Sequence, residues 1–129
     1  MNFEQSREFQ KELKRLQKKW RSLPNDLNAA EKAIKSLFVE PDDAKDTNLA
    51  EYRAAFFSGR AATILSQKSN CELIKMRLYS TDLKSNNKVR LIFVAVISEK
   101  RIMFVEIYSK SNKDSHDVAR ASGYFDNFS

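Results

Sequence analysis

The chain has 129 residues, of which 42% are hydrophobic and 31% charged, and its formal net charge is +6. This length predicts one domain, and the composition is that of an ordinary soluble globular protein. Because there is no long apolar span and no signal-peptide pattern, we expect a cytoplasmic protein that does not bind membranes. The positive charge favours an acidic partner such as a nucleic acid.

One cysteine and one histidine, Cys71 and His116, argue against several common kinds of site. They do not supply the ligand cluster of a transition-metal site, and a single cysteine forms no internal disulfide. The chain contains two glycines, too few for a glycine-rich phosphate loop. We therefore expect neither a metal ion nor a small-molecule cofactor.

The first 38 residues predict a short strand followed by two helices. Residues 1–3 form the strand, and Ser6 is a suitable N-cap for the first helix. Over residues 6–23 the apolar side chains recur at spacings of three and four, which places them on one helical stripe. These residues are Phe9, Leu13, Leu16, Trp20 and Leu23. A second helix over residues 26–38 completes an antiparallel hairpin whose apolar faces need a sheet to cover them.

Residues 39–70 show the weakest pattern. They contain an acidic loop over residues 41–46 and a short helix predicted over residues 49–57, with Gly59 at its end. The remainder is polar and small, and no element is assigned to it. We interpret the segment as an insertion in the domain and give it no part in the chemistry.

Three strands and a short helix are predicted in the C-terminal half. The strands cover residues 71–80, 88–97 and 101–110, and Val, Ile, Phe and Tyr dominate the last two. The chain after them is polar, with a helix predicted over residues 114–121. Three aromatic residues at the end of the chain either fold back on the core or contact a partner, and they are Tyr124, Phe125 and Phe128.

Alternation along the strands brings several cations to one face of the sheet. In the first of these strands three apolar residues alternate with two cations and a phenol, namely Ile74, Met76 and Leu78 with Lys75, Arg77 and Tyr79. Arg90 alternates in the same way with Val89 and Leu91. We therefore expect Lys75, Arg77 and Arg90 on an open face, opposite the face that the helices cover.

Cations with phenol, imidazole and carboxylate groups nearby are sufficient for metal-independent RNA cleavage. A base takes the proton of the attacking 2′-hydroxyl, cations stabilise the phosphorane, and an acid protonates the leaving 5′-oxygen. A lysine among other cations has a lowered pKa and can act as the base, while arginine offers paired donors to phosphate. The alternative is a solvated face whose charges only keep the protein soluble.

The order of these motifs resembles the RelE/ParE superfamily of toxins from type II toxin–antitoxin systems, and RelE and HigB in particular. The resemblance covers roughly residues 3–38 and 71–120, and it rests on the phrases FQKELKRL, IKMR, VRLIFVAV and VEIYSK. It implies an α+β fold in which an N-terminal helical hairpin packs on one face of a small, mainly antiparallel sheet, with a short C-terminal helix. Residues 1–129 would then form one such domain, with residues 39–70 inserted.

The resemblance also assigns roles to individual residues. Lys75 corresponds to a lysine that acts as a base or stabilises charge, and Arg90 to the arginine that holds the scissile phosphate. The predicted catalytic residues are Lys75, Arg90, Lys110 and His116, and the predicted RNA-binding residues are Arg77, Lys88 and Lys113. Leu73, Ser111 and Asp117 replace a lysine, an arginine and a tyrosine of the family pattern. His116 is then a substitute acid or base, and the identity of both groups stays open.

The function implied by the resemblance is ribosome-dependent cleavage of mRNA, which inhibits translation. The partners would be mRNA, the ribosome and a neutralising protein antitoxin. Two alternatives remain open, a ParE-like inhibitor of DNA gyrase and a non-catalytic basic module that binds RNA or protein. The missing lysine and tyrosine favour the alternatives, whereas the shared face of Lys75, Arg90 and Lys110 favours cleavage.

Overall fold

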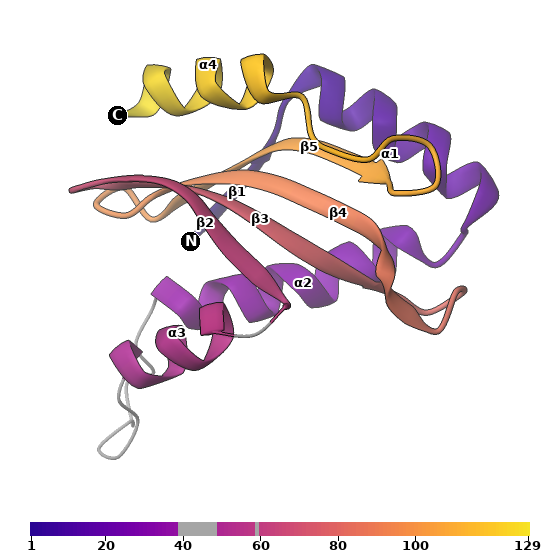
Figure 1. Cartoon of the computed structure of the whole chain (residues 1–129), viewed down its shortest axis with the longest axis horizontal. Helices are drawn as coiled ribbons and strands as arrows, with labels where there is room; N and C mark the ends of the chain where they lie inside the picture. Colours follow the sequence, from indigo (N-terminus) through magenta and orange to yellow (C-terminus); the bar gives the residue numbers. More distant parts are fainter. Residues whose placement is uncertain (39–48, 59) are drawn as a thin grey trace.

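The computed structural model describes residues 1–38, 49–58 and 60–129. They form, in chain order, β1 (Asn2–Gln5), α1 (Arg7–Lys19), α2 (Leu23–Phe38), α3 (Leu49–Ser58), β2 (Ala62–Lys68), β3 (Cys71–Ser80), β4 (Ser85–Val96), β5 (Arg101–Ser109) and α4 (Val118–Phe128) (Figure 1). The predicted α+β class is confirmed, with two N-terminal helices, a mainly antiparallel sheet and a short C-terminal helix. None of the described helices is long and apolar enough to cross a membrane.

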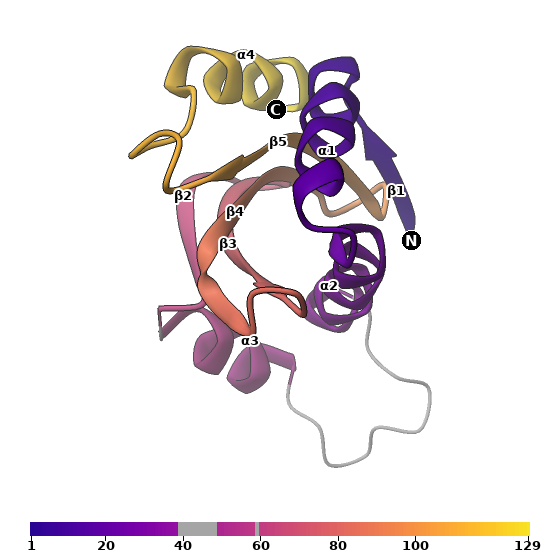
Figure 2. The same ribbon diagram turned by 90° about the vertical axis from the view of Figure 1, so that its right-hand side faces the viewer.

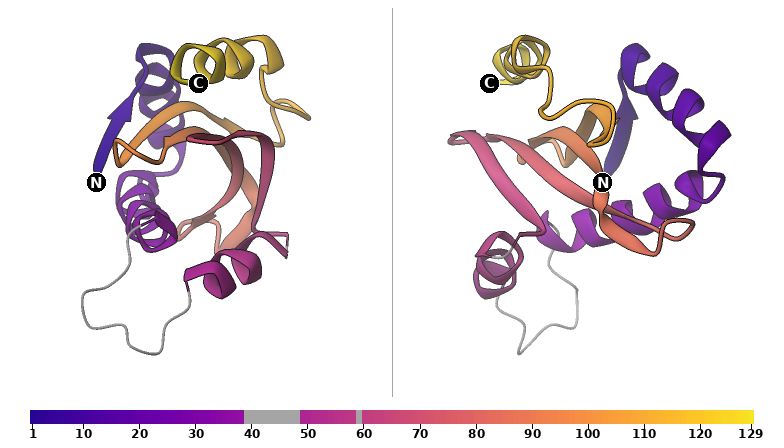
Figure 3. Two further views of the ribbon diagram at one scale, coloured as in Figure 1. Left: turned by 90° about the vertical axis from the view of Figure 1, so that its left-hand side faces the viewer. Right: turned by 45° about the vertical axis from the view of Figure 1, so that its right-hand side comes forward.

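The strands form a single sheet in the order β1-β5-β4-β3-β2. The N-terminal strand β1 pairs parallel to β5, and the other neighbouring strands are antiparallel. Figure 2 shows α1 and α2 following one another along one side of the curved sheet. Figure 3 shows α4 on one side of the sheet, with α2 and α3 on the other. Each face of the sheet therefore has its own layer of helix.

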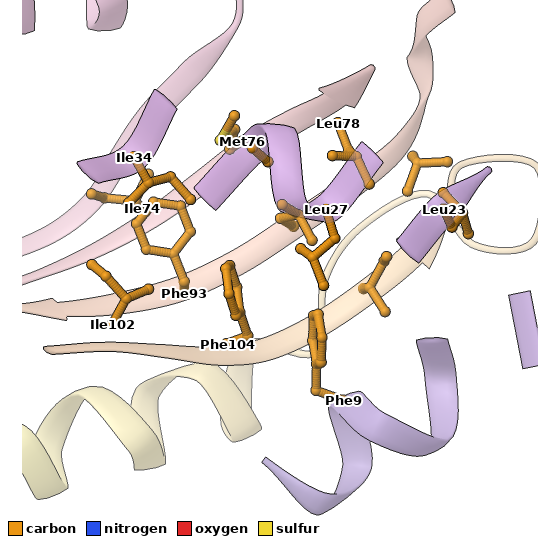
Figure 4. Close-up of a cluster of buried hydrophobic side chains, with 14 of the residues drawn as sticks. Phe9, Leu23, Leu27, Ile34, Ile74, Met76, Leu78, Phe93, Ile102 and Phe104 are labelled. Atoms are coloured by element: carbon orange, nitrogen blue, oxygen red, sulfur yellow. The ribbon is translucent and has the colours of Figure 1, made fainter. Parts of the chain in front are cut away.

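The main core lies between the sheet and the two N-terminal helices (Figure 4). The ring of Phe104 stacks on Phe9 with 5.2 Å between centroids and meets Phe93 edge-on at 6.0 Å. All three side chains are fully buried. The Ser6 side chain caps α1 by accepting a hydrogen bond from the Phe9 amide at 3.1 Å, as the sequence predicted. The apolar stripe of α1 thus sets how the helix lies on the sheet.

A second, smaller core lies on the opposite face, under α4. Phe125 and Ala121 pack there on apolar side chains of β3, β4 and β5. The aromatic end of the chain therefore folds back on the protein's own core. The predicted helix over residues 114–121 is misplaced, because Asp117 is the N-cap and accepts a hydrogen bond from the Arg120 amide at 3.0 Å.

The structure corrects other sequence-based boundaries. The second helix begins at Leu23, with Pro24 in its first turn, where a missing amide hydrogen costs nothing. The short helix predicted over residues 49–57 is confirmed as α3. Residues 62–68, which had no assigned element, form β2. This strand lies at the sheet edge and exposes much of its length, so its sequence lacks the apolar alternation of a half-buried strand. The acidic loop over residues 41–46 and Gly59 lie outside the described residues.

Candidate functional site

The site is built on two neighbouring rows of residues that cross the sheet. In the first row, Arg77 of β3 lies directly opposite Arg90 of β4, which lies opposite Tyr108 of β5. In the second row, Lys75 lies between Thr63 of β2 and Ile92 of β4. Strand pairing therefore fixes the relative positions of the cations, and Lys75, Arg77 and Arg90 share one face as the alternation predicted.

A pocket of about 460 Å³ opens over these rows. Its lining residues come from the segment leading into β2, from β2 itself, from β3 and β4, and from the position just after β5. They are Arg60, Ala61, Ala62, Thr63, Leu65, Lys75, Arg77, Arg90 and Lys110. Five of them are cationic and none of these lining residues is acidic. The pocket therefore favours an anionic ligand.

A β-bulge in β5 decides which of its side chains face this side of the sheet. Ile92 pairs with Glu106 but Phe93 pairs with Phe104, so Val105 is an extra residue on β5. Phe104 belongs to the core under α1 and α2, whereas Tyr108 belongs to the core on the opposite face. Uninterrupted alternation would have put these two aromatic residues on the same face. The bulge turns Tyr108 towards the cations, as bulges beside functional sites commonly do.

Tyr108 is the aromatic residue of the site, and sequence reasoning missed it. Its side chain is buried, and within the described ranges its hydroxyl has no hydrogen-bond partner. The Nζ atoms of Lys75 and Lys113 lie 6.0 and 5.3 Å from its ring centroid. Burial raises the pKa of Tyr108, so the phenol is protonated at neutral pH and can donate a hydrogen bond. The phenol that alternation placed here, Tyr79, is instead 55% exposed and does not line the pocket.

Glu106 fastens the loop that carries His116. This carboxylate is buried and accepts hydrogen bonds from the Lys113 ammonium and from the Asp117 amide, the latter at 2.8 Å. His116 lies between these two anchor points in the chain. Glu106 is a charged residue between apolar neighbours in β5, and the sequence predicted no such role for it.

His116 and Lys75 are the two groups suited to proton transfer. Burial and the neighbouring charge of Lys75 lower the pKa of His116, so its imidazole is neutral at pH 7. Its Nδ1 atom is buried and has no partner in the described part of the chain. Burial and the charge of Arg90 also lower the pKa of Lys75. His116 and Lys75 are therefore close enough for the charge of one to act on the other.

The remaining predicted site residues differ in their position relative to the pocket. Lys110 is exposed and lines the pocket, next to the end of β5. Lys88 is exposed, and although its carbonyl accepts the Lys110 amide at 2.8 Å, it is not a lining residue. Lys113 forms an ion pair with Glu106, which offsets much of its charge. Arg60 lines the pocket but precedes a strand that the sequence did not reveal, so no signal pointed to it.

Taken together, these residues offer phosphate-binding cations, a neutral proton acceptor and two proton donors. No group of three or more His, Cys, Asp or Glu side chains able to hold a metal ion occurs in the described ranges. The chain matches no family model, no curated protein and no solved structure. Membership of the RelE/ParE superfamily therefore stays a prediction from the order of the motifs.

Proposed function

We propose that this protein is a metal-independent endoribonuclease that cleaves mRNA on the ribosome, as the toxin of a toxin–antitoxin pair. The observation that carries the proposal is the pocket with five cationic lining residues and no acidic one. His116 does not line this pocket, but the charge of Lys75, which does, acts on its imidazole. An RNA backbone is a polyanion that needs cations at its phosphates and proton transfer at its 2′-hydroxyl. The residues around this pocket supply both.

In the proposed reaction, His116 accepts the proton of the 2′-hydroxyl as its oxygen attacks the adjacent phosphorus. Arg90 and Lys75 bind the non-bridging oxygens, whose negative charge increases in the phosphorane. Lys75 then protonates the 5′-oxygen as the bond from phosphorus to that oxygen breaks, and its lowered pKa makes it a stronger acid. The products are a 2′,3′-cyclic phosphate and a 5′-hydroxyl end.

The proposed partners follow from charge and from the motif order. A protein with net charge +6 and a cationic pocket associates readily with ribosomal RNA and mRNA. The RelE/ParE resemblance supports a protein antitoxin, and a segment rich in Asp and Glu would complement the pocket electrostatically. Such a segment would block the phosphate-binding residues without touching the cores.

The proposal is tested by inducible expression in bacteria with mapping of mRNA 5′ ends before and after induction. We expect growth arrest and new 5′-hydroxyl ends, both lost in Lys75→Ala and Arg90→Ala. Arg21→Ala is the matched control, because Arg21 is exposed and lies outside the pocket lining. Arrest without new ends would contradict cleavage and favour a protein target such as gyrase. Soluble protein without arrest would favour a non-catalytic binding module.

A further inference from the structure

The segment that leads into β2 builds one wall of the pocket, although sequence analysis gave it no role in the chemistry. The Ala61 carbonyl accepts a hydrogen bond from the Arg77 amide at 2.8 Å, and Thr63 lies opposite Lys75 in the β2–β3 ladder. The main chain next to Arg60 is thereby tied to the sheet. Arg60 is exposed and lines the pocket together with Ala61, Ala62, Thr63 and Leu65. Its place at the pocket is set by strand pairing.

The charges of the pocket exceed what a single phosphodiester can neutralise. Arg77 and Arg90 are directly opposite each other on adjacent strands, and like charges in such pairs repel. Arg77 has a neutral partner, because it donates to the Asn87 side-chain oxygen at 2.8 Å. The carboxylate of Glu106, which acts on Lys75, is already paired with Lys113. One phosphodiester carries one negative charge, so the five cations of the lining can contact more than one phosphate.

We propose that the pocket binds two successive phosphates of single-stranded RNA, the scissile one at Lys75 and Arg90 and its neighbour at Arg60 and Arg77. This inference rests on the proposed function for the identity of the ligand, and it adds Arg60 and the β2 segment to the site. Arg60 and Arg77 line the same pocket as Lys75 and Arg90, so both pairs of cations face one ligand. Arg60 is then a residue that positions the RNA strand by its second phosphate.

The test measures binding of short probes that cannot be cleaved. These are 2′-O-methyl oligoribonucleotides with one, two or three phosphodiesters and no terminal phosphate, studied by isothermal titration calorimetry at several salt concentrations. We expect affinity to rise about tenfold from one phosphodiester to two, the size of one charge-assisted hydrogen-bonded contact. The third phosphodiester should add much less. In Arg60→Gln the gain in affinity from one phosphodiester to two should disappear, while the affinity for the single-phosphodiester probe is unchanged.

The salt dependence provides a second, independent readout. Loss of one phosphate contact should make the slope of log affinity against log salt shallower by about 0.7 for the longer probes. Arg21→Gln removes the same charge from an exposed position outside the pocket lining, so it controls for net charge. Because Arg60 is exposed, Arg60→Gln should fold normally, which circular dichroism verifies.

The outcomes separate this inference from the proposed function. Equal losses in Arg60→Gln and Arg21→Gln, or no loss in Arg60→Gln, would overturn the second phosphate position even if the protein cleaves mRNA. A wild-type affinity that rises evenly with every phosphodiester would overturn it as well. If the step is present and Arg60-dependent but no RNA is cleaved in cells, the two-phosphate site stands and the endonuclease proposal fails.

Discussion

At the residue scale, the site contains a pair of like charges that destabilises the folded protein. Arg77 and Arg90 face each other across two strands, and the side chain of Arg90 is only 6% exposed. Burial and the charge of Arg77 lower the pKa of Arg90, although an arginine remains charged. Because such a pair works against stability, its presence supports the proposal that this site binds an anion.

We therefore expect Arg77→Gln to stabilise the free protein while weakening RNA binding. The gain in free energy of unfolding should be about 0.5 kcal/mol at low salt, the usual size of a cross-strand charge effect. Arg77 is partly exposed, so salt screens the repulsion and the gain should shrink at 1 M salt. Urea unfolding followed by circular dichroism measures both values, with Arg21→Gln as the control. A loss of stability that is the same at both salt concentrations would contradict the repulsion.

The pH dependence of cleavage tests the assignment of base and acid. His116 must be neutral to accept a proton, so the rate should rise with pH through its pKa, which lies below the ordinary 6.5. Lys75 must be protonated to act as the acid, so the rate should fall through its pKa, which lies below the ordinary 10.5. Single-turnover cleavage of an RNA substrate on ribosomes, measured across pH, gives the profile. In His116→Asn the rise of the cleavage rate at low pH should disappear. If the rise persists in that variant, another group is the base.

At the scale of elements, the sequence predicted those parts of the site that follow regular alternation. Lys75, Arg77 and Arg90 lie on β3 and β4, where apolar and polar residues alternate without interruption around them. Tyr108 could not be placed, because one extra residue in β5 reverses the direction of every side chain after it. Arg60 could not be found either, because an exposed edge strand carries no apolar pattern. Both misses come from pairing between strands, which is a long-range property.

In the loop after β5, one buried carboxylate positions the side chain that we propose as the base, His116. Glu106→Gln keeps an acceptor for the Asp117 amide but removes the charge that holds Lys113. Lys113 is then released beside the cationic pocket, so RNA affinity should rise while the rate constant for cleavage falls as His116 loses its fixed position. Stability should fall by roughly 1–3 kcal/mol, because a buried charged hydrogen bond is lost.

Binding assays with the uncleavable probes and single-turnover cleavage separate these two effects of Glu106→Gln. Lys113→Gln is the companion variant, since it breaks the same ion pair without freeing a cation. It should lower the cleavage rate without raising RNA affinity. If Glu106→Gln lowered affinity and left the rate constant unchanged, the loop would not depend on this carboxylate.

At the scale of the whole molecule, the sheet face that carries the second core has one part that α4 covers and another part that it leaves open. The helix α4 covers one part with Phe125 and Ala121, and the cationic pocket occupies another. Arg120 of α4 reaches both other layers, donating to the Glu12 carboxylate at 2.8 Å and to the Val105 carbonyl at 2.7 Å. The C-terminal helix thus joins α1 and the sheet, and the His116 loop is held between β5 and this helix.

A truncation in the core under α4 tests whether RNA binding depends on the packing of this helix. Phe125→Ala should lower the free energy of unfolding by about 3–5 kcal/mol, because Phe125 is 6% exposed in an apolar core. Phe128→Ala is the matched control and should lower the free energy of unfolding by less, because Phe128 is only partly buried. Its ring centroid lies 4.8 Å from the Arg101 Cζ atom. Urea unfolding gives both values. At temperatures where both variants are folded, RNA affinity should equal that of the wild type, because no lining residue of the pocket belongs to α4. A parallel loss of affinity and stability in Phe125→Ala would show that the cationic pocket depends on the α4 core, and the two parts of this face would then act as one unit.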